Sequence, residues 1–245
     1  MSTRFFVTAD AQSKPEPAEL ETCFPFLTER SHVISLVGGG GKTTLMMTLA
    51  EKYCAKGMKT VVMTTTRILR PQQAVSTLEA CRARWEAGEY AVCGEDAPEG
   101  KLRAPKDEVL TALLEEADAV LIEADGAKRM PCKAPADHEP VILPKSDIVI
   151  GVVGAEVLFQ PVERVCFRPE QVCSVLGCNK EDCLTENDLA KLLLSEKGTR
   201  KSVDDRIYYI AINKCDDEER LQNGIQIAHA IQTHRHEKVV LMKLK

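Results

Sequence analysis

The stretch that decides the fold is His32-Val33-Ile34-Ser35-Leu36-Val37-Gly38-Gly39-Gly40-Gly41-Lys42-Thr43-Thr44. Its first half is a short apolar run with β-branched residues, which is typical of a buried parallel strand. After the glycines, Leu45, Leu49 and Tyr53 recur at helical spacing until Gly57, which is expected to end a helix. The stretch therefore predicts a strand, a glycine loop and a helix in that order.

A glycine loop in this position is suited to phosphate. Glycines let backbone N–H groups approach phosphate oxygens closely, and the start of a helix adds its positive dipole. We expect Lys42 to reach the β- and γ-phosphates and the Thr43 hydroxyl to bind Mg²⁺. The residues predicted to bind nucleotide here are Gly38, Gly39, Gly40, Gly41, Lys42, Thr43 and Thr44.

The loop departs from the standard phosphate-binding motif. That motif has a glycine five residues before the one at Gly41, where this chain has Leu36. The loop is therefore about two residues short and should offer phosphate fewer amides. The alternative interpretation is a glycine-rich turn with an incidental lysine.

The rest of the chain alternates strands with helices, which predicts a three-layer α/β fold with a mainly parallel sheet, similar to P-loop NTPases. Strands are predicted over 32–37, 59–63, 90–93, 119–122, 147–153, 207–212 and 238–242, and helices over 44–56, 76–85, 106–116, 168–176, 186–196 and 218–234. A loop is expected over 94–105, and a Thr185-x-x-Asp188 signal is expected to cap the helix at 186. Residues 1–30 are predicted as an irregular N-terminal extension with a short helix near 18–23, and residues 31–245 as the nucleotide-binding domain with a helical segment at about 165–200.

Two acidic residues follow the strand at 119–122. Glu123 and Asp125 are two positions apart, so they should share one face and hold Mg²⁺ directly or through water. Either could also act in catalysis by orienting a water or a substrate hydroxyl. The third position after Asp125 is Lys128, not the glycine of the γ-phosphate-sensing switch of signalling GTPases, and solvated acids capping a strand are the alternative.

A charged segment comes next. Lys128, Arg129 and Lys133 could stabilise transferred charge, and His138 with Glu139 could serve as a catalytic base and the group that orients it. A solvated loop explains the same spacing equally well.

The run Asn213-Lys214-Cys215-Asp216 follows the strand at 207–212. A carboxylate at Asp216 could accept hydrogen bonds from the N1–H and amine of guanine and would repel the N1 acceptor of adenine. Asn213 would brace the loop, and the stem of Lys214 would cover the base. Guanine is favoured, while adenine and cytidine stay open.

Composition bounds the partners. A net charge of −5 without a long basic run argues against nucleic acid as a partner. No apolar stretch is long enough to span a membrane, and charges and prolines between Arg4 and Pro17 interrupt any signal-peptide core, so a cytoplasmic protein is expected. Reduced thiols are expected for the ten cysteines, with a metal or redox role as the alternative for Cys166, Cys173, Cys178 and Cys183.

Together these motifs resemble the YqeC family. They are Leu36–Thr44, Thr64–Thr66, Glu123–Gly126, Lys133–Pro135, His138–Pro140 and Asn213–Asp216, in one order over about residues 31–220. The resemblance implies a cytosolic bacterial accessory protein that helps a selenium-dependent molybdenum hydroxylase to mature, and its members share the short glycine loop.

Three functions follow from this combination. The first is Mg²⁺-dependent binding and slow hydrolysis of GTP or ATP, with occupancy switching loops near 64–67 and 126–138 and a molybdenum hydroxylase or its maturation machinery as client. The second is transfer of a phosphoryl or nucleotidyl group to a cofactor precursor. The third is a binding module that retains nucleotide without chemistry.

Overall fold

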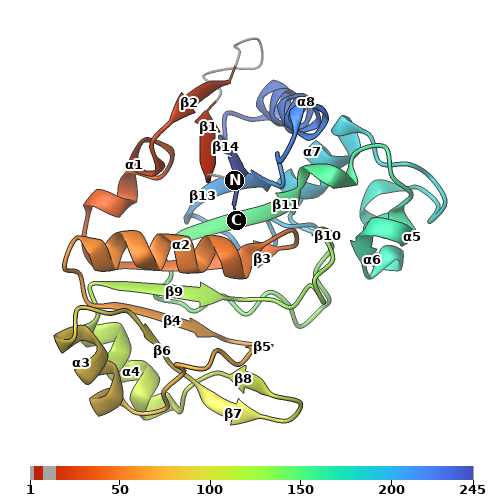
Figure 1. Ribbon diagram of the computed structural model, residues 1–245. Helices are drawn as coiled ribbons and strands as arrows, with labels where there is room; N and C mark the ends of the chain where they lie inside the picture. The colour runs from red at the N-terminus through yellow and green to blue at the C-terminus, as the bar shows by residue number, and fades with distance from the viewer. Residues whose placement is uncertain (1–2, 8–14, 245) are drawn as a thin grey trace.

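The computed structural model describes residues 3–7 and 15–244, and its centre is a mainly parallel sheet with helices on both faces (Figure 1). Within the described residues the strand order is β2–β1–β14–β13–β11–β3–β9–β4–β6. These strands are β1 (Arg4–Val7), β2 (Glu16–Ala18), β3 (His32–Gly38), β4 (Thr60–Thr64), β6 (Ala91–Val92), β9 (Ala119–Glu123), β11 (Ile148–Gly154), β13 (Ile207–Asn213) and β14 (Lys238–Lys243).

Alternation along the strands sends side chains to opposite faces of the sheet. Ile34 and Leu36 of β3 pack with Leu45 and Leu49 of α2, whereas Val37 belongs to the core on the other face. The first face carries α1 (Leu20–Cys23), the 3-10 helix η1 (Pro25–Thr28) and α2 (Lys42–Ala55). The second carries α3 (Leu78–Glu86), α4 (Asp107–Glu116), α7 (Glu186–Leu194) and α8 (Glu218–His234). The predicted three-layer α/β fold is confirmed.

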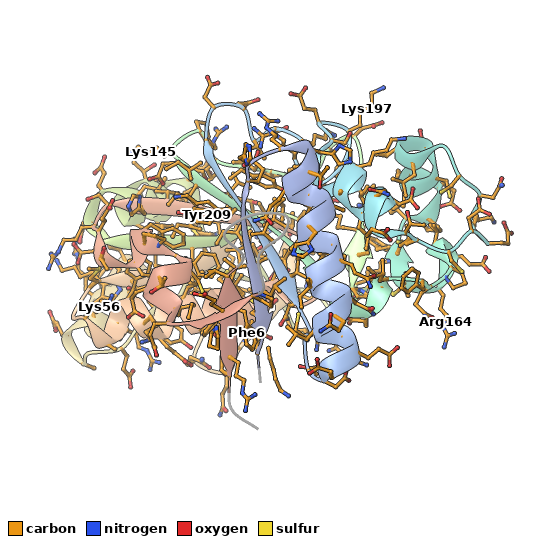
Figure 2. All side chains as sticks on the ribbon, turned by 90° about the horizontal axis from the view of Figure 1, so that it is seen from above. Phe6, Lys56, Lys145, Arg164, Lys197 and Tyr209 are labelled. Carbon is orange, nitrogen blue, oxygen red and sulfur yellow. The ribbon has the colours of Figure 1, made fainter. Side chains whose placement is uncertain are left out.

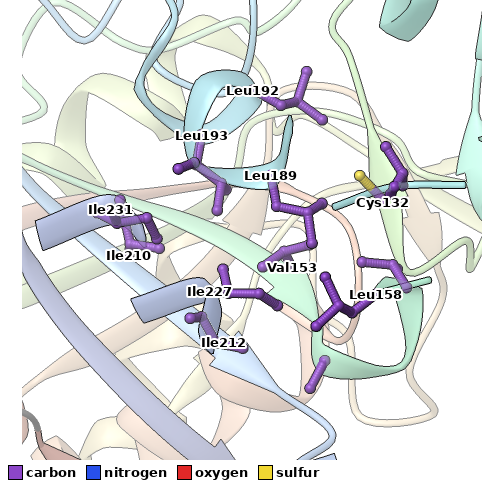
Figure 3. Close-up of a cluster of buried hydrophobic side chains, with 14 of the residues drawn as sticks. Cys132, Val153, Leu158, Leu189, Leu192, Leu193, Ile210, Ile212, Ile227 and Ile231 are labelled. Atoms are coloured by element: carbon purple, nitrogen blue, oxygen red, sulfur yellow. The ribbon is translucent and has the colours of Figure 1, made fainter. Parts of the chain in front are cut away.

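The second face holds the largest core. Ile210 and Ile212 of β13 point toward Ile227 of α8 and Leu189 of α7, and these side chains fill the space between sheet and helices (Figure 3). On this side, η2 (Ala155–Val157) packs against α8, α6 (Pro169–Leu176) packs against α7, and α5 (Val162–Val165) packs against α6. Exposed charges such as Lys197 lie at the periphery (Figure 2), where water solvates them.

Local signals explain several element ends. Thr185 and Asp188 form the predicted capping box of α7. Asp217 accepts a hydrogen bond from the Arg220 amide and so caps α8. Gly57, with a φ of 72°, follows α2 as expected for a glycine that ends a helix.

The expected loop over 94–105 is wrong. β7 (Glu95–Ala97) and β8 (Lys101–Arg103) form a hairpin there, and β5 (Arg67–Leu69) completes a small antiparallel sheet. β7 and β8 are three residues long and mostly charged, so no apolar alternation marks them. The turn between them has both Glu99 and Gly100 at positive φ.

Regular structure also appears in the region expected to be irregular. β1 pairs antiparallel with β14, and β2 pairs with β1, so both extend the main sheet. The short helix expected near 18–23 corresponds to α1. Residues 1–2 and 8–14 of the predicted extension, and residue 245, lie outside the described residues, and the division at residue 30 stays a prediction.

The parallel strands bring their carboxyl ends to one edge of the sheet. Glu123 ends β9 one strand away from the glycine loop after β3, and Gly154 of β11 lies beside Asn213 of β13. In open parallel sheets this edge is where ligands bind. None of the helices in the described part of the chain combines the length and apolar content that a membrane crossing requires.

Candidate functional site

The glycine loop has a backbone that only glycine fits well. Gly38, Gly40 and Gly41 have φ values of 95°, 76° and 116°, in the left-handed region. A Cβ at Gly40 would lie 2.4 Å from the amide nitrogen of Gly154, and one at Gly41 would lie 2.3 Å from Nδ2 of Asn213. Both conformation and packing therefore require the glycines.

The amides of the loop fall into two groups. The N–H groups of Gly39 and Gly40 donate to the carbonyls of Val152 and Met130, so the protein itself occupies them. The start of α2 has no side-chain cap. Within the described residues, no acceptor receives the amides of Gly41, Lys42, Thr43 and Thr44. A helix start with free amides is suited to an anion.

Lys42 lies between the loop and the acidic end of β9. Its Nζ donates to the Gly38 carbonyl at 2.5 Å and is 3.1 Å from Oδ1 of Asp125 and 3.8 Å from Oε1 of Glu123. Thr43 donates its hydroxyl proton to Glu123 at 2.6 Å, and Asp125 accepts the Gly38 amide. The structure thus brings the predicted lysine, threonine and both acids together.

The two acids have the oxygen chemistry that Mg²⁺ prefers. Burial raises the pKa of Glu123, and the charge of Lys42 opposes this shift. Such a buried carboxylate next to the Thr43 hydroxyl gives a hard, oxygen-only donor set beside the free amides. Of the residues predicted as metal ligands, Thr43 and Glu123 contact each other and line the cavity beside the glycine loop. Asp125 does not line that cavity, and its carboxylate is engaged by Lys42, Lys133 and the Gly38 amide.

A row of alternating charges runs from this point toward α6. Lys133 is buried, and its Nζ is 3.1 Å from Asp125 and 2.7 Å from Glu139. Arg168, just before α6, also pairs with Glu139. Burial alone would raise the pKa of Glu139, but hydrogen bonds from Arg168 and Lys133 outweigh it and lower that pKa to about 2. We call Lys42, Asp125, Lys133, Glu139 and Arg168 the charge row.

The predicted pairing of His138 with Glu139 does not form. Glu139 points into the charge row, whereas His138 is exposed in a turn and does not line the cavity beside the glycine loop. The side chains of His138 and Glu139 point in opposite directions, and their adjacency in the sequence does not reveal this. Lys128 and Arg129, in contrast, do line that cavity.

The end of β13 is arranged differently. Asn213 is buried and donates its amide proton to the Gly40 carbonyl at 2.8 Å, so it braces the glycine loop. Lys214, at a φ of 65°, lines the cavity. Asp216 is half-exposed, forms a 3.3 Å ion pair with Arg220 and does not line the cavity.

The cavity has a volume of about 600 Å³. It extends from Gly39–Thr44 past Lys214 on one side to Arg67 and Lys101 on the other. Sequence reasoning missed Arg67, Lys101, Arg168 and also Glu156, a cavity residue whose pKa burial raises. A usable signal existed only for Arg67, which follows the threonine run at the end of β4.

The cysteines predicted as a cluster are spread out. Cys166 faces Cys132 across the short parallel pair β10 (Cys132–Lys133) and β12 (Cys166–Phe167). Cys173 contacts Cys178, and Cys183 is exposed. Within the described residues, no group of three or more His, Cys, Asp or Glu side chains is placed to hold a metal ion.

The fold and this edge of the sheet define an α/β protein with the layout of a P-loop NTPase. A family model described as YqeC protein matches residues 34–170. The chain is also 32% identical to "Uncharacterized protein YqeC" of Escherichia coli (strain K12), with 77% of this chain and 79% of the relative covered. The chain belongs to the YqeC family.

Proposed function

We propose that the chain binds Mg²⁺ and a nucleoside triphosphate at the glycine loop, with GTP preferred to ATP. The observation that carries this proposal is the set of free amides from Gly41 to Thr44 at the start of α2. These amides lie near the Lys42 ammonium group, the Thr43 hydroxyl and the carboxylates of Glu123 and Asp125. Together these groups can bind both the phosphates and the Mg²⁺ of a Mg²⁺–triphosphate.

Each residue has a defined role in this proposal. The amides hold the phosphates, Lys42 leaves the Gly38 carbonyl to neutralise the β- and γ-phosphates, and Thr43, Glu123 and Asp125 hold Mg²⁺. When bound, Mg²⁺ supplies charge that offsets the charge of the phosphates. Hydrolysis is expected to be slow, because two glycine amides are occupied within the protein and His138 lies away from the site.

Base selection is assigned to Asp216. Its carboxylate is half-exposed, and its only described ion-pair partner is Arg220 on the surface, so exchanging that pair for hydrogen bonds to guanine would cost little. Its backbone carbonyl accepts a hydrogen bond from Lys243, which fixes the loop from β14. Asn213 joins this loop to the glycine loop through Gly40.

We further propose that nucleotide occupancy changes how the protein contacts a client, a molybdenum hydroxylase or its maturation machinery. Lys42 is one end of the charge row and Arg168, next to α6, is the other. A phosphate that withdraws Lys42 from Asp125 leaves Lys133 to serve both Asp125 and Glu139. Occupancy would thereby reach loop 126–138 and the helical segment beyond it.

Calorimetric titration with GTP, ATP and CTP, with and without Mg²⁺, tests binding. We expect Lys42→Ala to weaken binding by at least about tenfold, because it removes a charge-assisted contact. Thr43→Ala should remove the Mg²⁺ dependence with little risk to folding, since Thr43 is exposed. Lys52→Ala, on the same helix but away from the loop, is the matched control. Failure of every triphosphate to bind the wild type contradicts the proposal.

Phosphate release tests the accessory role. Slow turnover that a molybdenum hydroxylase client accelerates is the expected result, together with a client affinity that differs between nucleotide states. A client that binds all states equally and leaves the rate unchanged contradicts the switching proposal. Binding without turnover above background would instead identify a non-catalytic module.

A further inference from the structure

The cavity at the glycine loop has a second wall, away from the loop itself. Its far wall is formed by Arg67, Ile68 and Leu69 of β5 and by Lys101 of β8. These strands belong to the small antiparallel sheet, which lies beside the ends of β4 and β9 (Figure 1). The far wall is therefore separate from the elements that carry the glycine loop and the base-reading run.

The lining is strongly basic in a chain whose net charge is −5. In the described part of the chain, two carboxylates, Glu123 and Glu156, line the cavity. The basic residues that line it are Lys42, Arg67, Lys101, Lys128, Arg129 and Lys214. The proposed nucleotide contacts use Lys42 and Lys214, which leaves the others for another anion.

Two of these remaining cations form no direct ion pair among the described residues, although the charge of Arg67 acts on Glu99 at longer range. Among the described residues, no carboxylate lies within ion-pair distance of Arg67 or Arg129. Lys101 does have a partner, Glu99 at 2.7 Å, and Lys128 lies over the Phe167 ring at 5.2 Å. Both guanidinium groups are exposed to solvent, so a phosphate can accept their forked hydrogen bonds without breaking an existing ion pair.

The backbone supports the same assignment. Lys128 and Arg129 are consecutive residues at positive φ, 46° and 63°, which costs roughly 1–2 kcal/mol per residue outside glycine. The next residue, Met130, accepts the Gly40 amide, so this loop is held against the glycine loop. Arg129 is thus fixed beside the phosphate site at an energetic cost, as expected of a functional position.

An apolar surface adjoins these cations. Leu69, the last residue of β5, lines the cavity and is 58% exposed. Ile68 lies beside it and is buried. A ligand for this wall therefore needs an anionic group for the arginines and an apolar part for Leu69.

We propose that the far wall is a second ligand site, which binds a phosphorylated small molecule with an apolar ring or chain while nucleotide occupies the glycine loop. This proposal rests on the proposed nucleotide binding. If the protein transfers a phosphoryl or nucleotidyl group, the far wall is where the acceptor molecule would bind, next to the triphosphate.

Phenyl phosphate is the probe for this site. It is titrated by calorimetry into wild-type protein saturated with Mg²⁺ and a non-hydrolysable GTP analogue. Separate titrations with inorganic phosphate and with phenol measure how much the anionic group and the apolar ring each contribute to binding. The test variant is Arg67→Ala/Arg129→Ala, and the control Arg30→Ala/Arg164→Ala removes the same charge from exposed positions, with Arg164 at the periphery (Figure 2).

We expect one phenyl phosphate to bind the loaded wild type, and the test variant to lose at least about tenfold in that affinity while nucleotide affinity changes by less than about threefold. The control should behave as wild type. An equal loss of nucleotide affinity in the test variant would assign both arginines to the triphosphate and overturn the proposal. So would displacement of the nucleotide, or failure of phenyl phosphate to bind.

Two further outcomes keep the proposals apart. If no triphosphate binds the wild type, the proposed function fails. Arginine-dependent binding of phenyl phosphate to the nucleotide-free protein would still support the second site. If the loaded wild type binds an oligoglutamate peptide but not phenyl phosphate, the wall is a protein-docking surface and the small-molecule site is refuted.

Discussion

The ends of β9 and β13 lie at the same edge of the sheet, and both present polar residues to the glycine loop, but they hold it in different ways. At β9, Glu123 and Asp125 are buried and engaged by Lys42, by Lys133 and by the Gly38 amide. At β13, buried Asn213 braces Gly40 through an amide, and Asp216 stays half-exposed.

At the end of β13, different residues serve stability and ligand recognition, whereas at the end of β9 the same residues serve both. The β9 acids compensate buried cations, so removing one leaves a charge unpaired in the interior. At β13 the structural task belongs to Asn213 and the recognition task to Asp216. Loss of binding after a β9 substitution therefore needs a stability measurement before it can be interpreted.

The largest expected effect lies where the two ends meet, at Gly40. Gly40→Ala should lower the free energy of unfolding by about 4 kcal/mol, because left-handed φ and overlap with Gly154 both disfavour a Cβ. Gly88→Ala is the control, since Gly88 has a φ of 72° but nothing near its absent Cβ, and it should cost about 1 kcal/mol. Urea denaturation measures both, and equal losses would show that packing against Gly154 does not matter.

Asp125→Asn should be next in size. It leaves Lys42 and Lys133 short of a buried counter-charge, so we expect a loss of about 3 kcal/mol in unfolding free energy without any ligand. Nucleotide affinity should fall as well. A variant as stable as wild type would mean that Asp125 contributes to nucleotide binding but not to stability. The ends of β9 and β13 would then not differ in the way described above.

Glu139→Gln tests the charge row through pH. The pKa of Glu139 is lowered to about 2 in the folded protein, so its carboxylate stabilises the fold above pH 4.5, its ordinary value, and that contribution is lost as pH falls toward 2. We expect the variant to be less stable than wild type by on the order of 2 kcal/mol at pH 7. Denaturation curves taken between pH 4.5 and 2.5 should show the difference in unfolding free energy between the variant and wild type shrinking as pH falls. A difference that does not depend on pH would contradict a stabilising role for the ionised Glu139 carboxylate.

Asp216→Asn should have the smallest effect on stability, within about 0.5 kcal/mol, because its ion pair with Arg220 is on the surface. Its expected effect is on recognition, with the preference for GTP over ATP reduced by roughly tenfold or more. Competition titrations measure this ratio. An unchanged guanine preference would show that another residue reads the base.

Much of this arrangement could be predicted from the sequence, because parallel strands place their carboxyl ends together whatever the details of packing. Glu123, Asp125 and Asn213 were found in that way, and the central strands and most helices followed from apolar periodicity. The capping box at Thr185 was readable because it depends on local spacing alone.

The remainder depends on contacts that spacing does not encode. Glu139 pairs with Arg168, 29 residues away, and nothing local distinguishes it from its neighbour His138. β8 is a strand because β5 and β7 flank it, although its sequence is mostly charged. β1 likewise depends on β14, at the far end of the chain.

The charge row, together with Glu123, holds three carboxylates and three cations, so its formal charges cancel within a region of low polarity. A single change of sign at one of these positions leaves an odd charge that its neighbours cannot absorb. Descendants of this sequence can therefore alter the row only by paired replacements, for example at Lys133 together with Glu139. The five positions of the row and Glu123 should vary as a set when many lineages are compared.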